Sequence, residues 1–178
     1  MSKAAVIEHS PLRRLWLKWR FHLNILLLLI PLGLMPSYLH EASMSRGEIG
    51  LGERELGELK AGQWSVQIAE RFDETPRSDG PAGYFKQFNI ALCSTCAKVK
   101  AIYLRVGKPR SLRAAGALFS GNPYRMTGVV NIPVKTSPDA DLWLTFEDWD
   151  GSLQQVSIPL AKASPATVAW LKQQGGKS

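Results

Sequence analysis

The chain has 178 residues, of which 22 are Lys or Arg and 15 are Asp or Glu, so its formal net charge is +7. Its apolar fraction of 45% and charged fraction of 21% are typical of globular proteins and exclude wholesale disorder. All three histidines, His9, His22 and His40, precede residue 41. Ser-His-Asp catalysis, Cys-His catalysis and His-ligated zinc are therefore nearly excluded for the rest of the chain.

The first predicted element is a transmembrane helix over residues 21–40, which carry no formally charged side chain. A bilayer core of about 30 Å needs about 20 mostly apolar residues in a helix. Residues 1–20 hold five cations and one acid, a balance of +4: Lys3, Arg13, Arg14, Lys18 and Arg20 against Glu8. The positive-inside rule then predicts that residues 1–20 form a cytoplasmic tail and that the rest of the chain is exported. No A-x-A cleavage pattern follows the apolar run, which favours an uncleaved anchor over a signal peptide.

The next segment, residues 41–62, contains five glycines, and between them lie Glu48, Glu53, Glu55 and Glu58. Its apolar positions are too irregular for an amphipathic helix. We interpret it as a tether between the membrane and a folded domain.

Residues 63–178 show mostly strand patterns and predict a periplasmic β domain. Apolar residues alternate with polar ones in short runs separated by turn residues, which is typical of antiparallel sheets. The predicted strands cover residues 64–69, 84–92, 100–106, 124–132, 142–146 and 156–160. We therefore expect a mainly β fold, a small antiparallel sandwich of immunoglobulin-like type.

Two local signals complete the predicted domain. Asp150-Gly151 between alternating runs predicts a hairpin with a type I′ turn. Ser164 as N-cap and Pro165 at the first helical position predict a short helix through Trp170. The acidic run of residues 147–150 at the hairpin tip resembles an oxygen-rich cation site, although solvated tip residues are the favoured interpretation.

Cys93 and Cys96 form a C-x-x-C motif, for which three interpretations stay open. In an exported domain the first is a structural disulfide. The second is a thiol-exchange pair. The third is a soft-metal site, in which the two thiolates and the thioether of Met126 hold Cu(I). Haem attachment is excluded because Ala97 follows the motif.

Charge is segregated along the exported region. Residues 80–138 contain no Asp or Glu and nine cations. A loop with Lys108, Arg110 and Arg113, together with Arg125, is predicted to bind a partner or an anion, because Arg forks bind two oxygens at once. Anionic lipid headgroups, an acidic protein surface or an anionic ligand fit such a face, and the compartment excludes nucleic acid. The alternative is a solvated turn that protects an edge strand.

Three segments carry a resemblance to a known group of proteins: Cys93–Cys96, Ala101–Gly116 and Gly121–Arg125. They resemble small bacterial inner-membrane proteins that accompany PepSY-type reductases in ferri-siderophore (pyoverdine-like) iron-release systems. The resemblance covers about residues 60–160 and the anchor. It implies a non-enzymatic accessory subunit that helps a reductase to free iron in the periplasm, and it assigns no site residue.

We therefore expect an inner-membrane protein with one span, no catalytic residue and no cofactor, which serves as an accessory or interaction subunit in siderophore-iron or metal handling. The alternative is a thiol-redox or copper-chaperone protein that works through Cys93 and Cys96. Enzymatic acid-base chemistry would depend on carboxylates alone, and these form no recognisable pair.

Overall fold

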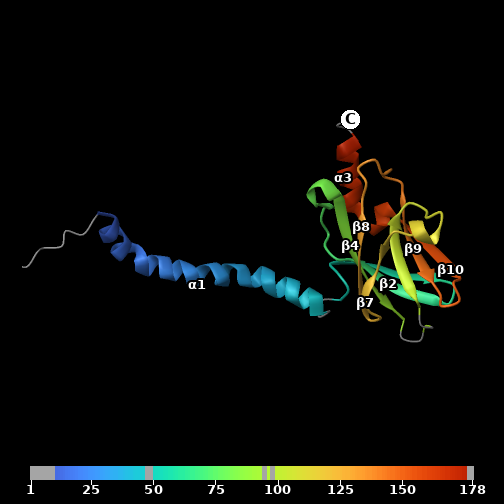
Figure 1. Ribbon diagram of the computed structural model, residues 1–178, viewed down its shortest axis with the longest axis horizontal. Coiled ribbons are helices and arrows are strands. Elements are labelled where there is room, and N and C mark those ends of the chain that lie inside the picture. Colours follow the sequence, from blue (N-terminus) through green and yellow to red (C-terminus); the bar gives the residue numbers. More distant parts are fainter. Residues whose placement is uncertain (1–10, 47–49, 94–95, 97–98, 176–178) are drawn as a thin grey trace, which may run out of the picture. The chain divides into compact units, whose positions relative to one another are not determined.

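The computed structural model describes residues 11–46, 50–93, 96 and 99–175. The chain divides into two units, Met1–Arg46 and Gly47–Ser178. The first contains one helix, α1 (Pro11–Arg46), drawn in blue in Figure 1. Its segment Pro11–His40 is apolar and long enough to span a membrane, as the sequence predicts.

The second unit contains two antiparallel sheets, which confirms the prediction of a mainly β fold. The larger sheet has the order β1-β2-β4-β8-β7, with β3 paired to β4. Its strands are β1 (Arg54–Ala61), β2 (Trp64–Glu70), β3 (Arg77–Ser78), β4 (Tyr84–Leu92), β7 (Ser120–Asn122) and β8 (Arg125–Asn131). The smaller sheet has the order β10-β9-β5-β6. Its strands are β5 (Ala101–Val106), β6 (Ala117–Leu118), β9 (Asp141–Glu147) and β10 (Leu153–Pro159).

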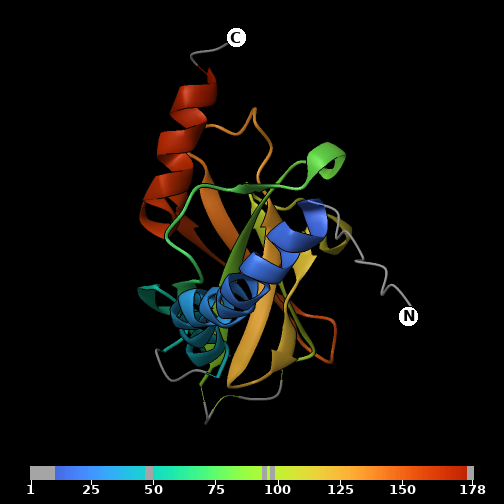
Figure 2. The same ribbon diagram turned by 90° about the vertical axis from the view of Figure 1, so that its left-hand side faces the viewer.

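Four short helical segments complete the part of the domain that the structure describes. They are η1 (Gly80–Ala82), η2 (Leu112–Ala114), α2 (Leu160–Ala163) and α3 (Pro165–Gly175). The last of these, α3, lies at one end of the sandwich in both views (Figure 1 and Figure 2). Its start confirms the predicted cap, because the backbone N–H of Thr167 donates to the Ser164 hydroxyl at 3.3 Å. The helix continues beyond Trp170, its predicted end, to Gly175.

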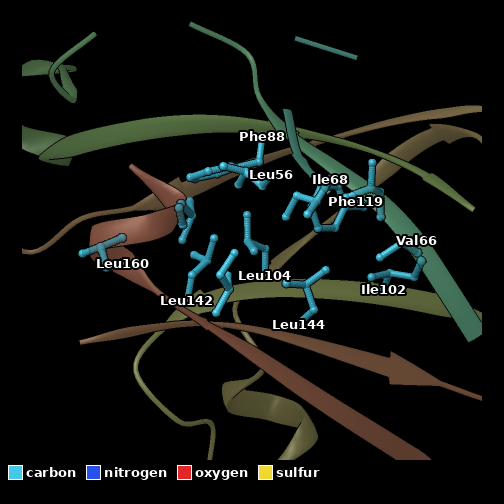
Figure 3. Close-up of a cluster of buried hydrophobic side chains, with 14 of the residues drawn as sticks. Leu56, Val66, Ile68, Phe88, Ile102, Leu104, Phe119, Leu142, Leu144 and Leu160 are labelled. Carbon is cyan, nitrogen blue, oxygen red and sulfur yellow. The ribbon is translucent and has the colours of Figure 1, made fainter. Parts of the chain in front are cut away.

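The core lies between the two sheets, where the alternate side chains of facing strands interdigitate (Figure 3). Val66 and Ile68 of β2 meet Leu104 and Leu144 of the smaller sheet within one cluster of fully buried side chains. Full burial of each such side chain contributes about 1.5–3 kcal/mol. The apolar residues that alternate along each predicted strand are therefore the residues that point into the core between the sheets.

The second half of the predicted tether is a strand, and this corrects the sequence interpretation. Residues 54–61 form β1, which pairs with β2 along its whole length. A register shift between Glu55 and Gly57 adds one residue to β1, and Gly57 has a φ of +90°. Because of this bulge the inward positions change from Leu56 to Leu59 and Ala61, so the period of two is broken. The sequence pattern looked irregular for that reason.

The predicted type I′ turn at Asp150-Gly151 is also wrong. Glu147 pairs with Leu153, so five residues separate the strands, and Gly151 alone among them has a positive φ, +84°. A two-residue turn lies instead between β1 and β2, where Ala61 pairs with Trp64 and Gly62 has a φ of +58°. A positive φ at the first central residue is the requirement of a type II′ turn.

The course of β2 defines the two ends of the sandwich. Near its start, the Ser65 carbonyl accepts a hydrogen bond from the backbone N–H of Cys93 at 3.0 Å. At its last residue, the carboxylate of Glu70 accepts a hydrogen bond from the Ser164 hydroxyl, next to α3. We call these the cysteine end and the α3 end.

Candidate functional site

A cleft of about 850 Å³ opens at the cysteine end of the sandwich. Its walls are formed by the end of β4, the beginning of β5, the β6–β7 segment, β8 and the β9–β10 loop. The lining residues are mostly apolar and include Leu92, Ile102, Leu118, Phe119 and Pro123. Cavities of roughly 300–1,000 Å³ are the usual size of small-molecule sites in proteins.

The disulfide between Cys93 and Cys96 lies in the wall of this cleft, with a Cα–Cα distance of 5.3 Å. It is held against β2, since the backbone N–H of Ser65 donates to the sulfur of Cys96 at 3.3 Å. Met126 lines the same cleft. The structure thus brings together the three sulfur-containing residues that the sequence singled out, and the two cysteines are joined as a disulfide rather than present as thiolates.

A lysine, a glutamate and a tyrosine form a hydrogen-bonded polar cluster in the cleft wall. The ammonium of Lys100 lies 2.6 Å from Oε1 of Glu147, and the Tyr103 hydroxyl donates to Oε2 of Glu147 at 3.0 Å. The hydrogen bond from Lys100 lowers the pKa of Glu147 and raises the pKa of Lys100. Burial, and then the hydrogen bond to Glu147, raise the pKa of Tyr103. All three groups therefore keep their usual charge at neutral pH.

Sequence reasoning missed this trio because its members come from different parts of the chain. In the sequence, Lys100 begins the predicted strand 100–106 as one of the nine cations of residues 80–138, and Glu147 belongs to the acidic hairpin tip. The pairing of β5 with β9, in which Ala101 faces Glu147, brings them together. The sequence predicts both strands, so a correct prediction of how they pair would have revealed these three residues as neighbours.

Two exposed aromatic side chains stand at the cleft. Tyr124 is 76% exposed and Trp149 is 70% exposed, and both belong to its lining. Trp149 belongs to the acidic run of residues 147–150 at the hairpin tip. Asp148 and Asp150 in that tip bind backbone N–H groups of their own loop, at Trp149 and Ser152. The hydrogen bonds from Ser152 lower the pKa of Asp150.

The predicted anion-binding residues fall into two settings. Lys108, Arg110 and Arg113 are exposed in the connection between β5 and β6, which we call the basic loop. The ammonium of Lys108 lies 5.4 Å from the ring centre of Trp143, at the distance of a cation–π contact. Among the residues that the structure describes, neither Arg110 nor Arg113 has an ion-pair or hydrogen-bond partner through its side chain.

Arg125, the fourth predicted anion-binding residue, lies on β8 and not in the basic loop. Its guanidinium donates to the carbonyl of Gly50 at 2.8 Å and to that of Leu51 at 3.3 Å. Burial and the nearby charge of Arg71 lower its pKa. Arg125 therefore holds the segment before β1 against the sheet and is less available to a ligand than the basic loop.

The acid-free stretch of residues 80–138 is partly neutralised by acids from outside it. Lys86 lies 2.7 Å from Glu70 of β2, and Lys100 pairs with Glu147 of β9. Arg105 is also engaged, since it donates to the carbonyl of Ala114 at 2.6 Å and ties the basic loop to β5. Among the described residues of this stretch, the exposed cations without an acidic partner lie in the basic loop and at Lys135.

The α3 end contains a second polar cluster, and this one is buried. Both the side chain of Glu70 and the hydroxyl of Ser164 are inaccessible to solvent, and Lys86 is 4% exposed. Glu70 binds Arg54 at 2.7 Å, Lys86 at 2.7 Å and the Ser164 hydroxyl. Arg54 also donates to the carbonyls of Lys162 and Ala163. This cluster joins the C-terminal helices to the sheet and offers no surface to a ligand.

The described residues contain no group of three or more His, Cys, Asp or Glu side chains arranged to hold a metal ion. The cleft can nevertheless take up an apolar body and present one ammonium group to it.

A family model with the description "Uncharacterised conserved protein UCP029505" matches residues 15–161. No curated protein and no solved structure matches the chain.

Proposed function

The chain belongs to the family of uncharacterised conserved protein UCP029505, and we propose that it is a membrane-anchored accessory subunit that docks to an inner-membrane complex through its basic loop. In this proposal residues 1–20 are cytoplasmic, α1 crosses the inner membrane once, and the β domain is periplasmic. The apolar length of α1 and the excess of cations before it support this orientation. A disulfide at Cys93–Cys96 is in keeping with an oxidising compartment.

The observation that carries the proposal is the state of the basic loop. Arg110 and Arg113 expose guanidinium groups that no carboxylate or carbonyl in the described domain engages. Arg105 fixes the loop by its bond to Ala114, so the cations are presented on a braced segment. Guanidinium forks recognise carboxylates in pairs of hydrogen bonds, and complementary charge steers association. The expected partner surface is therefore acidic.

The resemblance to accessory proteins of siderophore systems makes a PepSY-type reductase the first partner to examine. Such a subunit would contribute binding and placement rather than chemistry. The distribution of histidines and the bound state of the acidic tip support a role without catalysis.

The test is a pull-down of the full-length protein from detergent-solubilised membranes, with partners identified by mass spectrometry. Reversing the loop charges with Lys108→Glu, Arg110→Glu and Arg113→Glu should reduce partner recovery roughly tenfold or more, because like charges would then face each other. The matched control is Lys135→Glu, an exposed cation outside the loop. Undiminished recovery by the triple variant, or binding to anionic phospholipid vesicles in place of a protein complex, would contradict the proposal.

The orientation has its own test. A phosphatase that is active only in the periplasm, fused after Ser178, should be active in cells. If this fusion is inactive and a fusion to an enzyme that works only in the cytosol is active instead, the proposed topology and the docking role are both overturned.

A second candidate function is thiol redox exchange or copper transfer, and one observation favours it. The N–H of Ser65 points at the sulfur of Cys96 and would stabilise a thiolate there. In exchange with a partner dithiol, the Cys93–Cys96 disulfide would take up two electrons and two protons while the partner formed its own disulfide. Once reduced, the two cysteines and Met126 would supply a soft donor set for Cu(I). Full activity in cells of a Cys93→Ser, Cys96→Ser variant would exclude this function.

A further inference from the structure

We propose that the cleft at the cysteine end binds a small molecule with a planar aromatic body and one acidic oxygen group, such as an aromatic carboxylate. This site is separate from the basic loop, and it does not depend on the docking role proposed above. The inference combines three observations: which exposed apolar side chains line the cleft, how large the cleft is, and which cationic group its lining contains.

Half of the most exposed large apolar side chains of the described domain line the cleft. Within the described β domain six large apolar side chains are at least 40% exposed, and Leu118, Tyr124 and Trp149 line the cleft. These include both exposed aromatic rings of that set. Exposed aromatic rings beside a concave apolar surface favour a flat ligand, because ring stacking and the removal of apolar surface from water both contribute.

The interior of the cleft suits a ring system. Phe119 is 5% exposed and belongs to the lining, as do Met126 and the Cys93–Cys96 disulfide. Sulfur atoms make favourable contacts with the edges of aromatic rings. A volume of about 850 Å³ accommodates a ligand of two or three fused rings with its substituent.

The cationic group in the lining of the cleft is the ammonium of Lys100. Glu147 uses both of its oxygens, one for Lys100 and one for Tyr103, and its side chain is only 8% exposed. Lys100 is 43% exposed and has three N–H donors, one of which points to Glu147. The remaining donors favour an anionic acceptor on the ligand and disfavour a cation, which would meet like charge.

The test uses the full-length protein in nanodiscs of zwitterionic lipid, titrated with a fluoronaphthoate and, separately, with the neutral fluoronaphthamide. Fluorine NMR line broadening reports binding, and empty nanodiscs provide the blank. The naphthoate should bind about tenfold more tightly than the amide, because a hydrogen bond to a charged group contributes about one factor of ten. Equal affinity of the two probes, or no binding of the naphthoate, would overturn the proposal.

Variants separate the two parts of the site. Trp149→Ala and Tyr124→Ala should each weaken both probes by roughly tenfold, through lost stacking and lost apolar contact. Val134→Ala is the control, since Val134 is 45% exposed and does not line the cleft. A loss of the same size in Val134→Ala would assign the signal to non-specific adsorption and reject the site.

Lys100→Met should remove the preference for the naphthoate and leave the affinity for the amide unchanged. Lys135→Met is the matched control for loss of a lysine charge. Because Lys100→Met leaves Glu147 without its partner, the double variant Lys100→Met, Glu147→Gln is measured beside it. If the double variant, folded by its urea midpoint, still prefers the naphthoate, Lys100 is not the anion-binding group and the proposal fails.

Discussion

At each end of the sandwich a lysine, a glutamate and a hydroxyl group meet, and the two arrangements have opposite consequences. At the α3 end the side chains of Lys86 and Glu70 are 4% and 0% exposed. At the cysteine end those of Lys100 and Glu147 are 43% and 8% exposed. The distances between the charged atoms are nearly equal, 2.7 and 2.6 Å. The same three kinds of group are therefore buried inside the fold at the α3 end and accessible from a cleft at the cysteine end.

The difference teaches that burial, rather than residue type, separates a structural ion pair from a functional one. The Glu70 cluster is enclosed by two cations and the Ser164 cap, so a ligand has no access to it. The Lys100 pair is completed by a tyrosine and leaves donors at the surface of the cleft. Removing a charge should therefore affect stability at the α3 end and ligand binding at the cysteine end.

The largest effect is expected from Glu70→Gln. Loss of one member of a buried ion pair leaves an uncompensated charge and costs about 3–5 kcal/mol. Urea unfolding of the full-length protein, followed by tryptophan fluorescence, measures this change. Glu58→Gln, at an exposed position of β1, is the control and should stay within about 0.5 kcal/mol of the unsubstituted protein. If Glu70→Gln and Glu58→Gln lose similar amounts of unfolding free energy, the ion pair at the α3 end does not stabilise the fold and the contrast between the two ends is lost.

A smaller loss of stability is expected from breaking the disulfide with Cys93→Ser, Cys96→Ser. The cysteines are separated by three positions, and closing so short a loop contributes roughly 2 kcal/mol by chain entropy. Urea unfolding without reductant measures this loss. The unsubstituted protein, unfolded with reductant present, should give the same midpoint as the variant. A urea midpoint that neither the substitutions nor the reductant changes would show that the disulfide does not stabilise the domain.

Ser164→Ala tests the cap at the α3 end. It removes the N-cap bond to Thr167 and the bond to Glu70, and should cost about 1–2 kcal/mol. Ser111→Ala is a matched control, because Ser111 precedes η2 without a side-chain capping bond. Thermal unfolding of both variants in the same detergent gives the comparison, and equal melting temperatures would argue against the cap.

The smallest effect is the pH dependence of the pair at the cysteine end. The pKa of Glu147 is lowered in the folded protein, so its stabilising contribution is present above the unfolded value of about 4.3 and is lost as the pH falls through the folded one. The pKa of Lys100 is raised, so its contribution is present below about 10.4 and is lost above that value. The midpoint difference between the unsubstituted protein and Glu147→Gln should thus be constant from about pH 5 to 10. Urea midpoints across pH check this, and a change of the difference near pH 7 would contradict it.

Much of the secondary structure could be predicted from the sequence, because period and caps are local properties. The alternation of apolar residues located β2, β4, β5, β8, β9 and β10, and Ser164-Pro165 located the start of α3. The uncharged run of residues 21–40 indicated a helix that is apolar and long enough to span a membrane. Local patterns failed where one extra residue changed the phase, as the bulge at Gly57 did for β1.

The candidate site was predicted only in part. The cysteine motif and Met126 were identified by residue type, and the cleft that contains them was not. Arg125 and Lys108 look alike as cations in an acid-free stretch, yet Arg125 binds backbone carbonyls and Lys108 lies in the exposed basic loop, beside the ring of Trp143. Residue type and spacing do not show which groups become the neighbours of a side chain when the domain folds.

The sequence by itself determined the long apolar helix, six of the strands and the capped helix, because each depends on residues a few positions apart. Only the tertiary structure decided which charges are enclosed and which remain open. Lys100 and Glu147 are 47 positions apart, and Glu70 and Ser164 are 94 apart. Contacts over such separations follow from the pairing of strands and the packing of two sheets, and their free energy depends on the burial that this packing creates.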